Sequence, residues 1–311
     1  GGDPFSAALI NPTTGDVDVT VVTATATQTV LRQAQTGFTL TLTGTGLSAT
    51  PLTTPTGTIT ATAIRDASGT LLAEGTGFSW AAAAYFNAVR ALIDADNPAP
   101  LATLYNLQAV TWDLTGRTER FDTLLEGIAP LITSNHTIVG SSFGERLRGG
   151  QGNDVIRVNA AAFETYEVIF ASPGNDTYDF TGILPRSPTG QIRSDYVEVV
   201  YAGINTPITV SINGGTNSGS VTGLFGPPVG GGAGGGGGAG GAGPGTHTLF
   251  GIRQALLEAD GFGIVGTSGA DVFTVDPGPG ARFTQIAGNA GADTYNLTLN
   301  GTVRLQFIGP Y

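Results

Sequence analysis

The chain reads Gly149-Gly150-Gln151-Gly152-Asn153-Asp154-Val155-Ile156 at the point where a glycine-rich turn runs into a short apolar strand. The glycines permit positive φ, and so a tight turn whose carbonyl groups can face a cation. Asp154 adds a charged oxygen of the hard type that calcium prefers. Val155 and Ile156 favour a strand, with Ile156 turned into a core. The stretch therefore predicts a turn able to bind a cation, followed at once by a strand.

The same frame recurs along the chain, each time with an acidic residue at position 6 and an apolar residue at position 8. The further frames cover residues 140–147, 171–178, 266–273 and 288–295. Asp154 and Asp176 are separated in the sequence by the same offset as Asp271 and Asp293. A unit of two turns therefore appears twice, and such regular recurrence is the sequence signature of a repeat architecture.

These frames resemble the glycine- and aspartate-rich nonapeptide of RTX (haemolysin-type) calcium-binding proteins, and the resemblance extends over roughly residues 110–307. Segments 195–203, 208–215 and 245–252 also resemble the sequence between the repeat blocks of that family. The resemblance implies a β-solenoid, of the β-roll or parallel β-helix type, with calcium between successive turns. It also implies an extracellular or cell-surface location, reached by a type I-like export route.

The resemblance implies two calcium sites, one between Asp154 and Asp176 and one between Asp271 and Asp293. The glycines that would form the turns and offer carbonyl oxygens are Gly150, Gly152, Gly174, Gly269 and Gly291. Two carboxylates, carbonyls and water can supply the roughly six to eight oxygens that calcium takes. The alternative is a turn without metal, in which each Asp accepts hydrogen bonds from backbone N–H groups. Glu145 occupies position 6 of the first frame, alone on its edge.

Composition limits the possible partners. The chain has 311 residues, a formal net charge of −11 and 12% charged residues. This balance argues against nucleic acid or an anionic membrane surface and is compatible with binding divalent cations. The sequence has no Cys, which excludes disulfides and thiol chemistry, and no apolar run of about 18 residues that would predict a membrane span. Gly1 in place of an initiating Met indicates a processed chain or a piece of a longer one.

The pattern divides the chain into three regions. Residues 1–78 are β-rich, with period-2 alternation from about residue 16 onward. Residues 79–109 predict a helical cap over the open end of the β stack, with Ser79 as the N-cap of its first helix. Residues 110–311 predict the solenoid and include a short helix over 253–259. The Gly-rich stretch 230–245 predicts a flexible loop, or else an ordered glycine surface that packs against its copy in a second chain.

The sequence contains no motif that supports a catalytic role. Residues 140–144 match G-x-S-x-G, but the next residues continue the repeat frame instead of starting a helix, so Ser142 is not expected to be a nucleophile. His136 and His247 lie far apart in the sequence, and the zinc-protease motif H-E-x-x-H is absent. We therefore expect a protein that is not an enzyme.

The expected function is that of a secreted, calcium-binding structural or adhesive protein of the bacterial cell surface. It would be an adhesin, a surface-layer unit or a filament component that associates with itself or with other surface components. One alternative is the calcium-binding accessory region of a larger secreted hydrolase. Another is a receptor- or glycan-binding module, for which Trp80, Trp112 and exposed tyrosines would have to line a groove.

Overall fold

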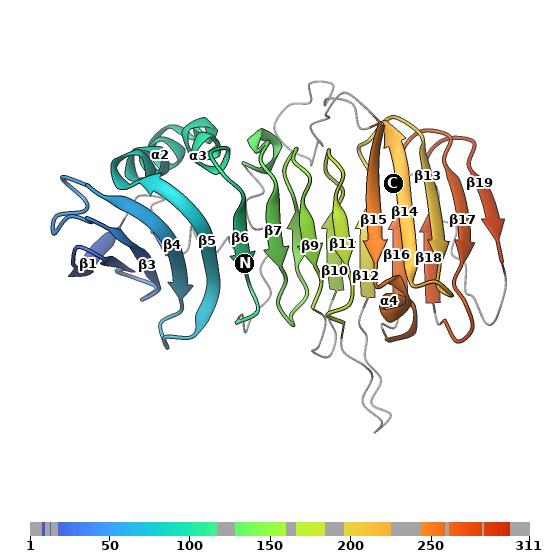
Figure 1. Cartoon of the computed structure of the whole chain (residues 1–311), viewed down its shortest axis with the longest axis horizontal. Coiled ribbons are helices and arrows are strands. Elements are labelled where there is room, and N and C mark those ends of the chain that lie inside the picture. Colours follow the sequence, from blue (N-terminus) through green and yellow to red (C-terminus); the bar gives the residue numbers. More distant parts are fainter. Residues whose placement is uncertain are drawn as a thin grey trace.

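The structure, a computed structural model, describes residues 8–9, 13, 18–116, 128–159, 166–183, 196–224, 244–258, 261–281 and 283–298. Within these ranges the protein is mostly β, and the strands form one sheet of fourteen strands and a second sheet of five. Figure 1 shows the larger sheet extending across the whole length of the molecule, with the smaller sheet behind its second half.

The first part of the larger sheet is antiparallel and is built from strands that are neighbours in the sequence. Its strands are β1 (Val19–Ala24), β2 (Gln28–Gln33), β3 (Thr39–Thr45), β4 (Thr58–Arg65) and β5 (Leu71–Ala81). Alternation drives this arrangement on β3, because Leu40 and Leu42 are buried while Thr41 and Thr43 lie on the opposite face. The β-rich prediction for this region is confirmed from β1 onward.

Two helices follow β5, and the first begins later than expected. The helices are α2 (Ala82–Ala95) and α3 (Ala99–Tyr105). Ser79 is not the N-cap, because β5 continues to Ala81 and Trp80 pairs with Ile59 on β4. Strand pairing therefore overrides the local capping signal.

The aromatic residues around these helices form a buried cluster. Trp80 stacks on Phe78, contacts the rings of Tyr85 and Tyr105, and donates its indole N–H to the carbonyl of Leu104 at 2.9 Å. Trp112 contacts Phe78 and Tyr105 in the same cluster. Both tryptophans are 1% exposed. The glycan-binding alternative required these tryptophans to line a groove, and they are buried instead.

From β7 onward, apart from the hairpin described below, the chain runs as parallel strands that alternate between the two sheets, and β6 lies parallel to β7 in the larger sheet. In the larger sheet these strands are β6 (Val110–Asp113), β7 (His136–Val139), β9 (Val155–Arg157), β11 (Thr177–Asp179), β13 (Ile208–Asn213), β17 (Val272–Asp276) and β19 (Thr294–Leu297). In the smaller sheet they are β8 (Arg146–Arg148), β10 (Tyr166–Phe170), β12 (Tyr196–Val200), β16 (Gly261–Val265) and β18 (Phe283–Ala287). We call one pass through both sheets a rung.

The strand register agrees with the spacing of the sequence frames. Val155 pairs with Thr177, and Val272 pairs with Thr294, so both pairings follow the offset that separates the paired aspartates. Leu147 pairs with Ile169 at the same offset in the smaller sheet. The first rung is shorter, because fewer residues separate Val155 from its partner Thr137 on β7.

A hairpin interrupts the regular succession of rungs. β14 (Ser218–Leu224) and β15 (Pro244–Phe250) lie between β13 and β11 in the larger sheet, and β15 is parallel to β11. Helix α4 (Ile252–Glu258) follows the hairpin and packs on β13, β14 and β16 through buried Ile252, Ala255 and Leu256. The helix predicted over 253–259 is therefore confirmed, whereas the glycine-rich loop falls almost wholly outside the described residues.

Apolar side chains fill most of the interior between the sheets and form one continuous core. Inward-facing side chains of successive rungs stack on one another, as with Ile138, Ile156, Tyr178 and Leu249, all of them buried. A short 3-10 helix, η1 (Ala129–Leu131), lies beside α3 near the first rung. Within the described ranges, none of the helices has both the length and the hydropathy needed to cross a membrane.

Candidate functional site: a buried carboxylate ladder

The carboxylates of Asp154 and Asp176 link neighbouring rungs through the backbone. The two Oδ atoms of Asp154 accept the N–H of His136 at 2.7 Å and that of Gly150 at 2.6 Å. Asp176 Oδ1 in turn accepts the N–H of Asp154 at 2.9 Å. Both side chains are buried. Each Asp therefore caps a backbone donor of the rung before it.

The second block repeats this arrangement with a different neighbour. Asp271 Oδ1 accepts the N–H of Ile208 at 2.8 Å, and Asp293 Oδ1 accepts the N–H of Asp271 at 2.9 Å. Thr267 adds its own N–H and hydroxyl to the Asp271 carboxylate at 2.7 Å each. The structure thus brings together both pairs of aspartates that were predicted to share a site.

In the first block, the asparagines that precede Asp154 and Asp176, together with Asn135 one rung earlier, make equivalent links on the outside of the turns. Asn135 Oδ1 accepts the N–H of Asn153 at 2.8 Å, and Asn153 Oδ1 accepts that of Asn175 at 2.7 Å. Asn175 Oδ1 accepts the N–H of Thr246 at 2.8 Å. Two parallel chains of side-chain caps therefore run along the stack, one buried and one exposed.

The glycines of the frames allow the turns to approach closely. Gly174 and Gly291 adopt φ of +114° and +118°, which an L side chain rarely adopts. A Cβ on Gly174 would collide with the carbonyl oxygen of Gly152, and one on Gly291 with that of Gly269. Gly150 is equally confined, since a Cβ there would lie 2.6 Å from the Ile132 carbonyl oxygen. These glycines stack one turn on the next.

Histidines occupy the two ends of the buried ladder in the first block. His136 precedes Thr137, and His247 precedes Thr248, in the register that places Asp154 and Asp176 between them. The imidazole of His247 lies 3.5 Å from Asp176 Oδ2 and 2.9 Å from the Tyr201 hydroxyl. The row therefore runs His, Asp, Asp, His across β7, β9, β11 and β15.

Burial disfavours the charged forms of these groups. It raises the pKa of Asp154 to about 6 and, together with the neighbouring charge of Asp154, raises the pKa of Asp176 well above its usual range. Burial also lowers the pKa values of His136 and His247 to about 4. The pKa of Asp271 is raised chiefly by burial and in part by the charge of Asp293.

A smaller carboxylate pair lies at the other edge of the rungs, leading into the smaller sheet. The N–H of Glu145 donates to Glu167 Oε2 at 3.1 Å, and Glu145 Oε2 accepts the N–H of Ser141 at 2.8 Å. Glu145 was expected to be alone on its edge, so its contact with Glu167 from the next rung is a correction. Ser142 lies in the turn between these partners, and β8 follows it in place of a helix.

The aspartate pairs suit a hard cation by charge and ligand type. The charge of Asp154 raises the pKa of Asp176, and that of Asp293 raises the pKa of Asp271, so a cation between them would relieve repulsion. Both oxygens of Asp154 already accept backbone N–H groups. Among the described residues no three His, Cys, Asp or Glu form a group that could hold an ion. A hard cation at either pair would need further oxygens from carbonyl groups and water.

The sequence analysis did not place the two histidines in the ladder, although the sequence around His136 contains a signal for it. Asn135-His136-Thr137 occupies the same place in the preceding rung as Asn153-Asp154-Val155, with His in place of Asp. Comparison of the chain with known proteins finds no similar family model, curated protein or solved structure.

Proposed function

We propose that the chain is a non-enzymatic structural module of an extracellular or cell-surface protein, built as a β-solenoid of the β-roll type. The observation that carries this proposal is the ladder of buried side chains that cap the backbone of the preceding rung. The ionisable groups of this ladder face inward and bond to neighbouring rungs, an arrangement that suits holding a stack together better than reacting with a substrate.

Self-association is part of the proposal. Among the residues that the structure describes, the larger sheet ends in β1 on one side and β19 on the other. An edge strand presents unpaired N–H and C=O groups to another chain. Val21 and Val22 on β1 are 39% and 57% exposed. These features support assembly of copies by strand addition at the sheet edges.

Calcium binding at the two aspartate pairs is a further part of the proposal. Asp154 with Asp176, and Asp271 with Asp293, would supply the charged oxygens, and the adjacent turns would supply carbonyls. A cation that binds only the folded state stabilises it by about 2.7 kcal/mol when its concentration is about 100 times the dissociation constant. Folding of the stack would then depend on calcium, which is scarce inside cells and plentiful outside them.

The test is a calcium titration of the full chain, followed by circular dichroism and thermal melting. We expect calcium to raise the melting temperature, and Asp154→Ala or Asp271→Ala to reduce that rise. Asp66→Ala provides the matched control, because Asp66 caps an exposed turn of the antiparallel region. A melting temperature that calcium and chelator leave unchanged would reject the calcium sites and leave the aspartates as turn caps.

Sedimentation tests the proposed self-association. Sedimentation of the wild-type chain should show concentration-dependent oligomers, and Val22→Lys on β1 should weaken them, because an edge charge opposes strand addition. A chain that remains monomeric at every concentration would contradict self-association.

A further inference from the structure

An apolar cavity lies between the first two strands and helix α2, well away from the carboxylate ladder. Four strands of the larger sheet separate β2 from β7, where the ladder begins. The cavity has a volume of about 260 Å³. An apolar cavity of about 150 Å³ can hold a benzene ring, so this one has room for a larger group. Its walls come from β1, β2, the β3–β4 connection and α2, through Val19, Leu31, Leu52, Tyr85, Phe86 and Val89.

The cavity has a buried floor and a charged mouth. Leu31, Phe86 and Val89 are buried. Arg90 and Asp94, the charged residues among those that line the cavity, are exposed on α2. Residues four apart on a helix are neighbours, with Cβ atoms about 5–6 Å apart. The apolar interior therefore opens to solvent beside one positive and one negative side chain.

The guanidinium of Arg90 is held in place at this mouth. Arg90 Nη2 donates to the carbonyl oxygen of Leu52 at 2.6 Å, which uses one of its N–H donors and leaves others for a ligand. Among the described residues, Arg90 forms no salt bridge with Asp94 or with another carboxylate. Both charged groups can therefore pair with a molecule that enters the cavity.

We propose that this cavity binds a free α-amino acid with a large apolar side chain, such as phenylalanine or leucine. The apolar side chain occupies the cavity, the α-carboxylate pairs with Arg90, and the α-ammonium pairs with Asp94. The two charges of such a ligand are attached to a single carbon atom, so both can face neighbouring groups at the mouth while the side chain points inward.

The charges at the mouth distinguish this ligand from other apolar molecules. A fatty acid pairs with Arg90 but is repelled by Asp94, and an apolar amine meets the reverse arrangement. A hydrocarbon that covers the mouth removes water from both charged groups and gives neither a partner. A sugar brings hydroxyl groups into a cavity whose walls supply few hydrogen-bonding groups. This inference does not depend on calcium binding or self-association.

The experiment is isothermal titration calorimetry on the full chain with L-phenylalanine, L-leucine and three reference compounds. Hydrocinnamate lacks the ammonium group, phenethylamine lacks the carboxylate, and glycine lacks the apolar side chain. We expect at least one of the two amino acids to bind. Each reference compound should bind at least about tenfold more weakly, because it loses a charge-assisted hydrogen bond or the apolar burial. Failure of both amino acids to bind the folded chain, or equally tight binding of hydrocinnamate, would overturn the proposal.

Variants then place the ligand in the cavity. Arg90→Gln and Asp94→Asn should each weaken binding at least about tenfold, because each removes one charged partner. Val89→Trp, which fills the cavity, should abolish binding. Arg65→Gln and Asp96→Asn are the matched controls and should bind as the wild type does. Both control residues are exposed and lie outside the cavity lining, and Arg65 also donates to a backbone carbonyl, as Arg90 does.

Circular dichroism and melting confirm that each variant is folded before its binding is compared. The substitutions at Arg90 and Asp94 change exposed side chains, so they remain informative if Val89→Trp does not fold. Binding by Arg90→Gln and Asp94→Asn as tight as that of the two controls would show that the amino acid binds elsewhere on the chain, and the cavity would be rejected as its site.

Discussion

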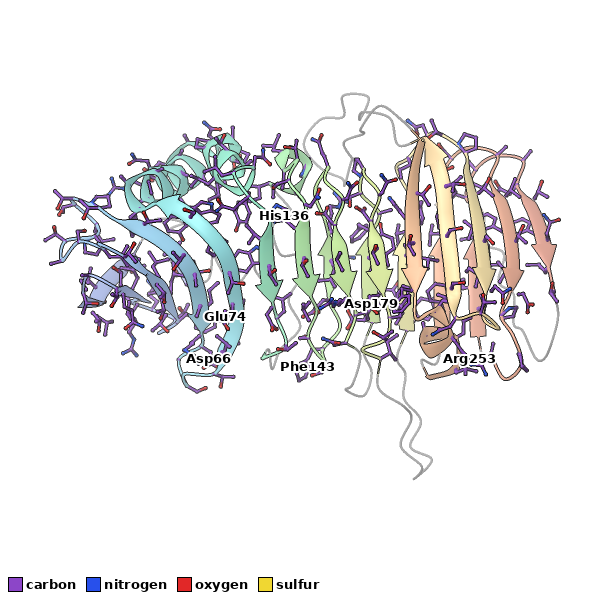
Figure 2. The ribbon with its side chains drawn as sticks, in the orientation of Figure 1. Asp66, Glu74, His136, Phe143, Asp179 and Arg253 are labelled. Atoms are coloured by element: carbon purple, nitrogen blue, oxygen red, sulfur yellow. The ribbon has the colours of Figure 1, made fainter. Side chains whose placement is uncertain are left out.

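The antiparallel strands β1–β5 and the rungs that follow use the same hydrogen-bonding device in different surroundings. Asp66, labelled in Figure 2, lies in the turn between β4 and β5. Its solvent-accessible carboxylate accepts the N–H groups of Ser68 and Thr70 at 2.8 and 2.9 Å. In the rungs, Asp176 accepts the N–H of Asp154 at a similar distance, but in the core. Water can replace the first cap and cannot reach the second, so burial decides what an identical contact contributes.

The largest expected effect is therefore the loss of a buried cap. Asp176→Ala leaves the N–H of Asp154 without an acceptor and removes the partner of Ser172 at 2.9 Å. Breaking a buried network of this kind should lower the free energy of unfolding by about 3–5 kcal/mol. Asp66→Ala should cost far less, because water replaces the exposed cap. Denaturant unfolding of both variants measures the difference.

Asp176→Asn sharpens this comparison. The amide oxygen can still accept the N–H of Asp154, and the neutral side chain removes the repulsion with the Asp154 carboxylate. We expect the Asn variant to be at least as stable as the wild type at pH 8 without calcium. A loss as large as that of Asp176→Ala would mean that the charge, and not the cap, stabilises the rung.

The rungs should also respond to pH through two opposing groups. Burial raises the pKa of Asp154 to about 6 from 3.8, so its ionisation destabilises the fold and stability rises as the pH falls from about 6 to 4. Burial lowers the pKa of His136 to about 4 from 6.5, so stability falls as the pH falls through the same window. Asp176 and Asp271 act in the sense of Asp154, and His247 acts in the sense of His136.

Single variants should separate the pH dependence due to Asp154 from that due to His136. Asp154→Asn should make the chain more sensitive to acid, and His136→Gln should make it less sensitive, each by about 3 kcal/mol between pH 7 and pH 4. Melting curves at half-unit pH intervals provide the measurement. Parallel pH profiles for the wild type and both variants would show that neither buried group titrates in this range.

The next comparison concerns two glycines, one packed against the neighbouring rung and one in an open turn. Gly174→Ala places a methyl group against the Gly152 carbonyl at a φ of +114°, and should cost about 3 kcal/mol. Gly69→Ala, in the β4–β5 turn at a φ of +88° with open space around it, should cost only about 1 kcal/mol. Equal losses in unfolding free energy would show that backbone strain alone, and not contact between rungs, restricts Gly174.

The rungs were predictable where one chemical unit is repeated. Glycine at the tight approaches and Asp at the cap recur at the same offset in both blocks, and the pairing of Val155 with Thr177 follows that spacing. The local pattern of the frame was enough to predict the register because each rung repeats the glycine contacts and the Asp cap of its neighbour. The short helix α4 was also predictable, from its local apolar spacing.

The remaining features depend on distant partners. The hairpin β14–β15 enters the larger sheet because Tyr178 pairs with Leu249, which lies far along the chain, and no local pattern specifies that pairing. His247 reaches the ladder by the same route. The start of α2 was misplaced because Trp80 pairs across the sheet with Ile59, which extends β5 beyond the apparent cap.

The exposed asparagine caps should show the smallest effect. Asn153→Ala removes the acceptor for the N–H of Asn175, but water can replace it at this exposed position. The expected loss is about 1 kcal/mol, well below that of the buried cap in the same stack. Hydrogen exchange of the Asn175 amide should accelerate in Asn153→Ala, while exchange of the Asp154 amide should remain slow because Asp176 still caps it. Equal acceleration at both amides would show that the two chains of caps form one cooperative unit.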